Sequence, residues 1–293
     1  MILNALTIDV EDYYHVTGFE RHIGRRDWGS FESRFEFGLA KILEGLAERG
    51  IKATFYILGW LARRHPQLLR ELDAAGHELG SHSYWHRQVF RLNASQFRAD
   101  LRRSKRVIED CTGKPVVTFR APSFSITERS LWALDILAEE GFESDSSIFP
   151  VSHDRYGIRN ANPHVHELTT TQGTLWELPP AVHVWGPLRL PVGGGGYFRL
   201  YPHSLTTACL RRINGTLRQP FVFYVHPWEF DAEQPRVGAG SGLSRIRHYV
   251  NLHSMNEKFA RLLSTFRFGR VCDVVAAAKE KTPSGASAAA SPT

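Results

Sequence analysis

Residues 5–12 read ALTIDVED, an apolar run that ends in carboxylates. Residues 5–10 are typical of a buried strand, which would carry Asp9, Glu11 and Asp12 to its carboxyl end. Strand alternation places Asp9 and Glu11 on one face, but Asp12 could turn inward if the strand ends at residue 10. Three acids this close repel one another unless a cation or an arginine lies among them. Taken alone, they could also be a helix cap or a solvated turn.

The rest of the chain alternates between strand-like and helix-like segments. Further strands are expected at residues 53–58, 77–80, 116–119, 142–145, 174–178 and 220–225, and helices at 37–49, 66–75, 93–111, 127–140, 204–213 and 243–264. Repeated strand–helix units predict an α/β fold with a parallel sheet that is closed or partly closed into a barrel. Loops after the strands converge at one end of such a barrel, so polar residues at strand ends are candidates for a site. Residues 282–293 are rich in Ser, Ala and Pro and are expected to be disordered.

Two histidines follow the expected strand at 77–80, within the segment GSHSYWH. His82 and His86 have i, i+4 spacing, so on a helical turn they would share one face and could bind one metal ion. Such pairs also arise by chance, but this one accompanies a cluster of acids at another strand end. Two imidazoles and one carboxylate, with open positions for water, describe a hydrolytic metal site. The ion would be divalent, with Zn2+ expected first and Co2+, Fe2+, Ni2+ and Mn2+ suited to the same donors.

Three more polar residues follow expected strands. Arg120 cannot lose its proton and needs an anion, either in a structural ion pair or to hold Asp9 in place as a base. His226 is either a buried, satisfied histidine or a general acid whose pKa lies near neutrality. Asp145 could pair with His226 and tune its proton affinity.

A glycine-rich segment and several aromatic residues give weaker signals. Residues 193–199 read GGGGYFR, without the strand–helix context of a phosphate-binding loop, so a nucleotide site is excluded. Tyr197 and Trp228 could stack on sugar rings, although core packing is the more common role of such residues.

Charge, cysteine content and hydropathy argue against nucleic-acid-binding, disulfide-stabilised and membrane-spanning proteins. The net charge is +6 and the pI about 9.3, but the basic residues are scattered, which favours a solvated basic surface over nucleic-acid binding. Cys111, Cys209 and Cys272 lie far apart and suggest neither a disulfide framework nor a thiolate zinc site. No apolar stretch approaches the roughly 20 residues of a membrane-spanning helix. The first strand begins almost at Met1 and leaves no room for a signal peptide, so a cytoplasmic location is expected. Nothing indicates an oligomeric state.

Taken in order, these segments resemble the NodB-type polysaccharide deacetylases, the fourth carbohydrate esterase family, over residues 1–275. The most specific match is HSYWH at 82–86, which fits the family's His-Ser-x-x-His metal motif. Within the family, the chain looks most like the deacetylases of exosortase-linked (PEP-CTERM) exopolysaccharide clusters. That likeness rests on DVEDYY at 9–14, GGGYFRL at 194–200, HPWEF at 226–230 and RHYVN at 247–251.

The chain departs from the family pattern at two points. The family usually has two adjacent aspartates, whereas Val10 and Glu11 separate Asp9 from Asp12 here. Strand alternation favours Glu11 as the metal ligand, and side-chain identity favours Asp12. The segment after Arg120 also differs, which leaves open whether the backbone N–H of Phe124 completes an oxyanion site.

The resemblance implies a distorted barrel of about seven βα units, a single domain over residues 1–281 with a C-terminal extension from about residue 230. It also implies a metal-dependent N-deacetylase in which Asp9 is the base and His226 the acid, with Tyr197 and Trp228 contacting an N-acetylated polysaccharide or lipid-linked oligosaccharide. The enzyme would then act in the cytoplasm or at the inner membrane face. The alternatives are an amidohydrolase acting on a small amide and a catalytically inactive glycan-binding protein.

Overall fold

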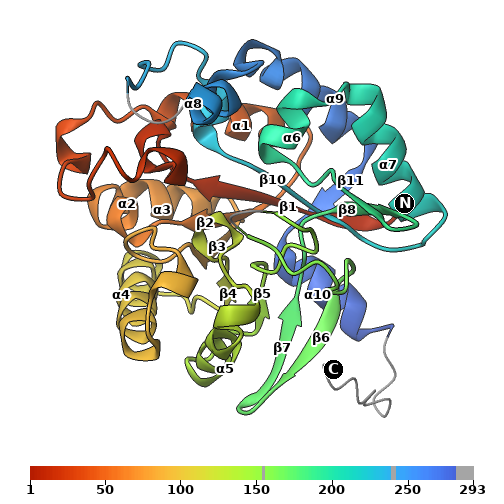
Figure 1. Cartoon of the computed structure of the whole chain (residues 1–293), viewed down its shortest axis with the longest axis horizontal. Helices are drawn as coiled ribbons and strands as arrows, with labels where there is room; N and C mark the ends of the chain where they lie inside the picture. Colours follow the sequence, from red (N-terminus) through yellow and green to blue (C-terminus); the bar gives the residue numbers. More distant parts are fainter. Residues whose placement is uncertain (154–155, 239–241, 282–293) are drawn as a thin grey trace.

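A computed structural model describes residues 1–153, 156–238 and 242–281 of the chain (Figure 1). Its main sheet has the strand order β10-β1-β2-β3-β4-β5-β7-β6, and β11 also pairs with β1. The pairings are parallel except for the antiparallel β6–β7 hairpin. The strands are β1 Leu3–Val10, β2 Thr54–Ile57, β3 Glu78–Ser81, β4 Thr118–Phe119, β5 Ser144–Asp145, β6 His166–Thr170, β7 Gly173–Glu177, β10 Val222–Val225 and β11 Arg267–Gly269.

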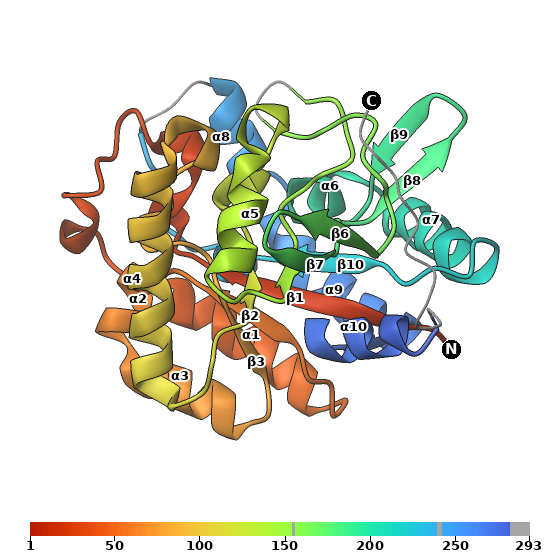
Figure 2. The same cartoon turned by 90° about the horizontal axis from the view of Figure 1, so that it is seen from below.

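The sheet curves into an incompletely closed barrel. Among the described residues, the segment after β7 is joined to β10 by two isolated bridges, Pro180–Val222 and Gly194–Tyr224. A separate hairpin of β8 Val182–Trp185 and β9 Leu188–Pro191 projects beside α7 His203–Gly215 (Figure 2). The fold is therefore the distorted α/β barrel that the sequence predicts.

Helices cover the outside of this sheet (Figures 1 and 2). Besides α7 they are α1 Phe35–Ala47, α2 Gly59–Arg64, α3 Pro66–Ala74, α4 Ala94–Thr112, α5 Trp132–Glu139, α6 Gly195–Leu200, α8 Gly242–Tyr249, α9 Met255–Thr265 and α10 Val271–Lys279. None of the helices in the described ranges is long and apolar enough to cross a membrane.

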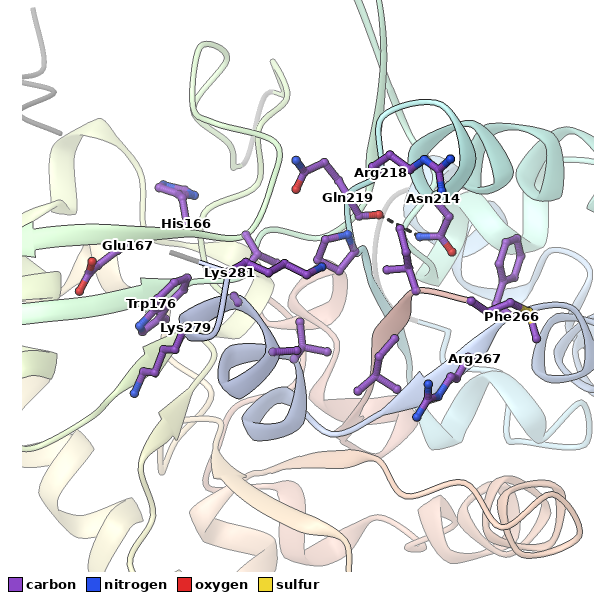
Figure 3. Close-up of a pocket in the computed structure, with 18 of the residues that line it drawn as sticks. His166, Glu167, Trp176, Asn214, Arg218, Gln219, Phe266, Arg267, Lys279 and Lys281 are labelled. Carbon is purple, nitrogen blue, oxygen red and sulfur yellow. Dashed lines mark hydrogen bonds between the residues drawn. The ribbon is translucent and has the colours of Figure 1, made fainter. Parts of the chain in front are cut away.

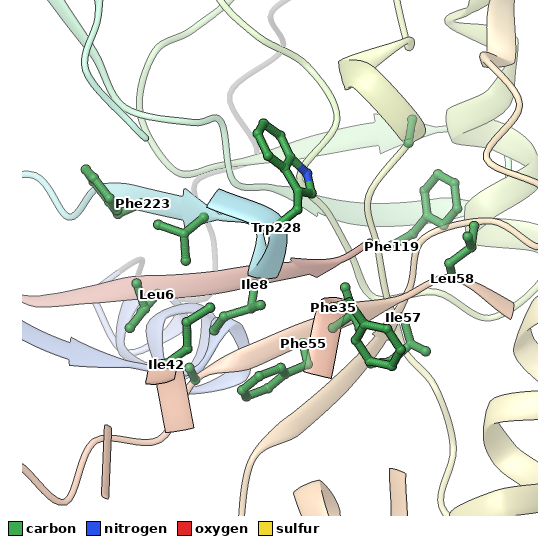
Figure 4. Packing of buried hydrophobic residues seen from close by; sticks show 14 of the residues in the cluster. Leu6, Ile8, Phe35, Ile42, Phe55, Ile57, Leu58, Phe119, Phe223 and Trp228 are labelled. Carbon is green, nitrogen blue, oxygen red and sulfur yellow. The ribbon is translucent and has the colours of Figure 1, made fainter. Parts of the chain in front are cut away.

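The alternation of β1 divides apolar from polar residues. Leu6 and Ile8 are fully buried and pack with Ile42 of α1 in the main hydrophobic cluster (Figure 4). Thr7 and Asp9 lie on the opposite face of the strand, which faces the barrel interior. From Leu6 to Asp9 the strand is therefore apolar toward the helices and polar toward the interior, where a site can form.

Several expected elements differ in the structure. The helix expected at 243–264 is divided into α8 and α9 because Asn251 has a left-handed φ of 54°. The glycine-rich segment at 193–199 is not wholly a loop, since α6 begins at Gly195. The hairpins β6–β7 and β8–β9 and the short β11 lie partly or wholly outside the expected strands. The disorder expected at residues 282–293 concerns a segment outside the described residues.

Candidate metal centre and proton-transfer site

Glu11, His82 and His86 come together at the carboxyl ends of β1 and β3. Their possible ligand atoms all lie within 4.8 Å of one another, and all three residues are buried. Glu11 Oε1 is 2.9 Å from Nε2 of His82 and 2.9 Å from Nε2 of His86. The two imidazoles thus converge on one carboxylate oxygen.

The histidine pair lies in a bent loop, so the expected helical turn is wrong. Residues 82–88 contain no helix, and Ser83 and His86 have left-handed φ angles of 62° and 50°. The buried carboxylate of Asp100 on α4 accepts a hydrogen bond from the backbone N–H of Tyr84 at 2.7 Å. This loop, rather than helical periodicity, directs both rings to the same point.

The hydrogen bonds of His82 show that these residues fit a metal ion. His82 Nδ1 lies 2.8 Å from the backbone oxygen of Arg120, which can only accept, so Nδ1 carries a proton and Nε2 is the nitrogen directed at Glu11 Oε1, 2.9 Å away. A metal ion bound between Nε2 and this oxygen would take the place of the hydrogen-bonding proton there. Burial opposes ionisation of Glu11, but His86 and the hydrogen bonds from both histidines outweigh it and hold its pKa well below the ordinary value.

Asp12 is not part of this group, so its expected role as an alternative ligand is not supported by the structure. Its carboxylate caps the short turn Tyr13–His15 and accepts hydrogen bonds from Ser33 Oγ at 2.9 Å and from the backbone N–H of Arg34 at 2.8 Å. Burial raises its pKa in spite of these bonds. Strand alternation, which favoured Glu11, was the better guide because β1 continues to Val10.

Asp9 is held by Arg120, as the sequence suggested. Arg120 is fully buried, and its Nη1 donates to Asp9 Oδ1 at 2.7 Å and to Thr7 Oγ1 at 2.7 Å. The rest of the guanidinium donates to the backbone oxygen and the hydroxyl of Ser146. Because all these partners are fixed, one carboxylate oxygen of Asp9 is immobilised and Oδ2 remains available.

His226 lies opposite Asp9 at the end of β10. Its Nε2 is 3.8 Å from Asp9 Oδ2, and its Nδ1 is 3.1 Å from Oε2 of Glu229. Burial alone would lower the pKa of His226, but the hydrogen bond and charge of Glu229 outweigh it and raise that pKa to about 9. For Glu229, burial is likewise outweighed by His226, and its pKa falls to about 2.

Glu229, not Asp145, is therefore the carboxylate that is hydrogen-bonded to His226 Nδ1. Asp145 accepts hydrogen bonds from Ser147 and lies opposite Glu177 of the paired strand β7, and burial raises its pKa to about 6. Burial and the charge of Asp145 raise the pKa of Glu177 well above its ordinary value. The signal for Glu229 was its position three residues after His226, across the turn that follows Pro227.

The three expected substrate contacts are placed differently. The backbone N–H of Phe124 already donates to Ala121 O at 3.0 Å, so it is not a free oxyanion donor. Trp228 is only 6% exposed and is stacked between the rings of His226 and His248, which rules out an open sugar platform. Tyr197 is half-buried, with its hydroxyl 3.0 Å from that of Tyr156, and its contact with substrate stays a prediction.

A large hollow in the described structure lies elsewhere. It measures about 1570 Å³ and is formed by β6, β7, α10 and the start of β1 (Figure 3). Its lining includes Trp176, Phe266 and Arg267 but none of the residues that surround Glu11 or His226. Since the residues gathered around Glu11 lie at the other end of β1, this hollow is not the candidate site.

Two family models match the chain. Residues 29–141 match the model described as polysaccharide deacetylase, and residues 146–276 match one described as a domain of unknown function, DUF3473. The first range contains His82, His86 and Arg120, and the second contains His226 and Glu229.

Curated relatives cover only part of the chain. A peptidoglycan-N-acetylglucosamine deacetylase of Bacillus cereus is 25% identical over 118 residues, which are 36% of this chain and 43% of the relative. A peptidoglycan deacetylase of Helicobacter pylori is 27% identical over 124 residues, or 42% of this chain and 41% of the relative. The chain thus spans less than half the length of these curated relatives.

Solved structures resemble the chain over nearly its whole length. A Mycobacterium smegmatis protein described as a polysaccharide deacetylase superposes with a TM-score of 0.62 at 20% identity, covering 95% of this chain and 90% of that one. Puue allantoinase superposes with a TM-score of 0.61 at 14% identity, covering 96% and 91%. At these identities the likeness confirms the fold alone.

Proposed function

We propose, from the premise that residues 29–141 form a polysaccharide deacetylase domain, that this chain hydrolyses the acetamide groups of an N-acetylated glycan. One observation carries the proposal. Glu11 and two imidazoles converge on one buried point, and Asp9 and His226 face each other beside it with Nε2 and Oδ2 3.8 Å apart. A metal site next to a base and an acid is the arrangement that amide hydrolysis requires.

Glu11, His82 and His86 would hold a divalent cation, for which we propose Zn2+. Two imidazoles and one carboxylate are donors that Zn2+ accepts in hydrolytic sites, which keep positions open for water and substrate. When bound, the cation supplies Lewis acidity at the amide carbonyl.

Asp9 acts as the general base in this proposal. Arg120 occupies its Oδ1, so Oδ2 receives a proton from water as the water oxygen bonds to the acetamide carbon. Arg120 holds the carboxylate in one orientation, so Oδ2 is already positioned for proton transfer before the reaction begins.

His226 acts as the general acid. Its raised pKa keeps the ring protonated at neutral pH, and its Nε2 faces the same space as Asp9 Oδ2. As the carbon–nitrogen bond breaks, Nε2 transfers its proton to the amine, and the products are acetate and a free amino sugar.

For the substrate, we propose an exopolysaccharide or a lipid-linked oligosaccharide precursor, processed in the cytoplasm or at the inner membrane face. The curated relatives named above act on peptidoglycan, whose amino sugars carry the same acetamide group. The resemblance of residues 194–200, 226–230 and 247–251 to deacetylases of exosortase-linked clusters supports the exopolysaccharide.

Acetate release is the direct test. The protein is reconstituted with Zn2+ and incubated with N-acetylated chito-oligosaccharides, a bacterial exopolysaccharide and peptidoglycan, and acetate is measured beside a His226→Gln variant. Acetate release that depends on His226 supports the proposal. Hydrolysis of a small amide such as allantoin without acetate release would favour an amidohydrolase that acts on small amides. Saccharide binding without hydrolysis of any substrate would indicate an inactive glycan-binding protein.

A further inference from the structure

Beneath His226 lies an ion pair that the steps above do not use. Arg199 Nε donates to Glu229 Oε1 at 2.8 Å, and the two side chains are 2% and 0% exposed. The second carboxylate oxygen of Glu229 accepts from both the backbone N–H of His226 at 2.9 Å and the ring Nδ1 at 3.1 Å. Each oxygen of Glu229 is therefore committed to a different partner.

This arrangement determines which nitrogen of His226 faces the reaction. An ionised carboxylate only accepts hydrogen bonds, so Nδ1 must carry a proton toward Glu229. Nε2 is then the nitrogen that gains or loses a proton, and it is the one directed at Asp9. Without Glu229, the ring could adopt the other tautomer or rotate, because no other described side chain is hydrogen-bonded to Nδ1.

Arg199 is itself anchored by the C-terminal segment. Its Nη1 donates to the backbone oxygens of His248 at 2.7 Å and Val250 at 3.1 Å. Its own backbone oxygen accepts from Asn251 Nδ2 at 3.1 Å and from Lys258 Nζ at 3.0 Å. These partners, Arg199 and Glu229 all lie within residues 146–276, the range that matches a domain of unknown function.

We propose that Arg199 and Glu229 are positioning residues for His226, and that building this proton-donor half of the site is a function of residues 146–276. The catalytic importance of these two residues rests on the proposed function, in which His226 is the general acid. Glu229 acts through the orientation and charge of the imidazole and touches neither water nor substrate.

The experiment measures His226 directly. Histidine labelled with 15N is observed by NMR in the full-length, Zn2+-loaded protein, with the resonance assigned through His226→Gln, and the pH is varied. The groups facing the ring are Glu229 and Arg199 on one side, Asp9 and Glu11 at the end of β1, Tyr224 on β10 and His248 on α8. The variants keep all of these except the one substituted.

Glu229→Gln keeps the size of the side chain and removes its charge. The deprotonation midpoint of His226 is expected to fall by about one pH unit or more, with loss of the Nδ1–H tautomer. The alkaline limb of acetate release should move down with it, and kcat should fall about 10- to 100-fold while KM changes by less than about twofold. Glu229→Asp keeps a carboxylate, so its His226 midpoint should lie between those of Glu229→Gln and the wild type.

Asp231→Asn is the matched control. It removes a neighbouring ion pair, Asp231 with Arg34 at 2.7 Å, on the same turn but without contact to His226. Its His226 midpoint should equal that of the wild type. A folded Glu229→Gln protein with an unchanged midpoint and tautomer would overturn the inference, whatever its activity. Absence of acetate release from wild type would instead overturn the proposed function, while a shifted midpoint would still support the positioning role.

Discussion

Gly38 on α1 provides a test of how precisely the turn that carries His226 must be placed. Helix α1 packs against the turn Pro227–Phe230, and a Cβ on Gly38 would lie 1.8 Å from the backbone oxygen of Pro227. The obstacle is backbone, not the end of a flexible side chain. We therefore predict that Gly38→Ala displaces the turn.

The magnitude follows from that distance. Real Cβ atoms essentially never approach other atoms within 3.0 Å, so helix and turn must separate by roughly 1.2 Å. Alanine gains about 1 kcal/mol in helix propensity, which offsets part of an overpacking cost of about 1–3 kcal/mol. A misplacement of about 1 Å at a catalytic group can lower turnover about 100-fold. A 100-fold loss of kcat corresponds to about 2.7 kcal/mol, which exceeds the expected net loss of stability of about 0–2 kcal/mol.

The assay combines kcat for acetate release, the free energy of unfolding in urea, and bound zinc. Zinc content should stay at its wild-type value, because Glu11, His82 and His86 come from β1 and the loop after β3. Gly45→Ala on the same helix is the control, since its Cβ would meet Leu263 Cδ1 at 3.6 Å and Phe259 Cε1 at 4.0 Å, both ordinary van der Waals contacts. Wild-type kcat in a folded Gly38→Ala protein would refute the reasoning that ties this contact to the acid.

Three further predictions concern metal, stability and pH. His82→Ala combined with His86→Ala should reduce bound zinc from about one equivalent to none, as measured by elemental mass spectrometry, because it removes two of three ligands. Arg120→Met should lower the free energy of unfolding in urea by about 3–5 kcal/mol, since it removes the buried guanidinium that is hydrogen-bonded to the Asp9 carboxylate; a loss below about 1 kcal/mol would contradict this. The pKa of His226 is raised from 6.5 to about 9, so its contribution to stability is complete below pH 6.5 and lost as the pH rises through 9. In chelator-treated protein the free energy of unfolding should therefore decline between those pH values, and less steeply in His226→Gln.

The sequence was most informative where the topology leaves little freedom. Asp9 lies near the carboxyl end of a strand of the parallel sheet, and Arg120 and His226 each follow one directly, so the fold brings them to one end of the barrel. Glu11 could be favoured over Asp12 from strand alternation alone, because β1 is long enough to keep a regular period of two.

What could not be predicted depends on loops and on long-range contacts. The left-handed backbone of Ser83 and His86 leaves no periodic pattern in the sequence, so the histidine pair suggested a helix. Glu229 rather than Asp145 is hydrogen-bonded to His226 because the short turn Pro227–Phe230 brings its side chain back to the ring. Sequence position alone does not distinguish the two acids, since each lies at or soon after the end of a strand. The burial of Trp228 depends on His248, which lies in a separate helix.

The pairing of β1 has a consequence for how the chain folds. Residues 7–10 of this strand pair with β2, which is near in sequence. The strand also pairs with β10, where Ala5 lies opposite Val222, and with β11, where Leu3 lies opposite Arg267. Synthesis of the chain must therefore proceed for more than two hundred further residues before this strand gains its last neighbours. Contacts so distant in sequence make folding slow and leave a strand edge exposed on the nascent chain. We expect refolding from urea to be slow and to depend on protein concentration through aggregation of that exposed edge.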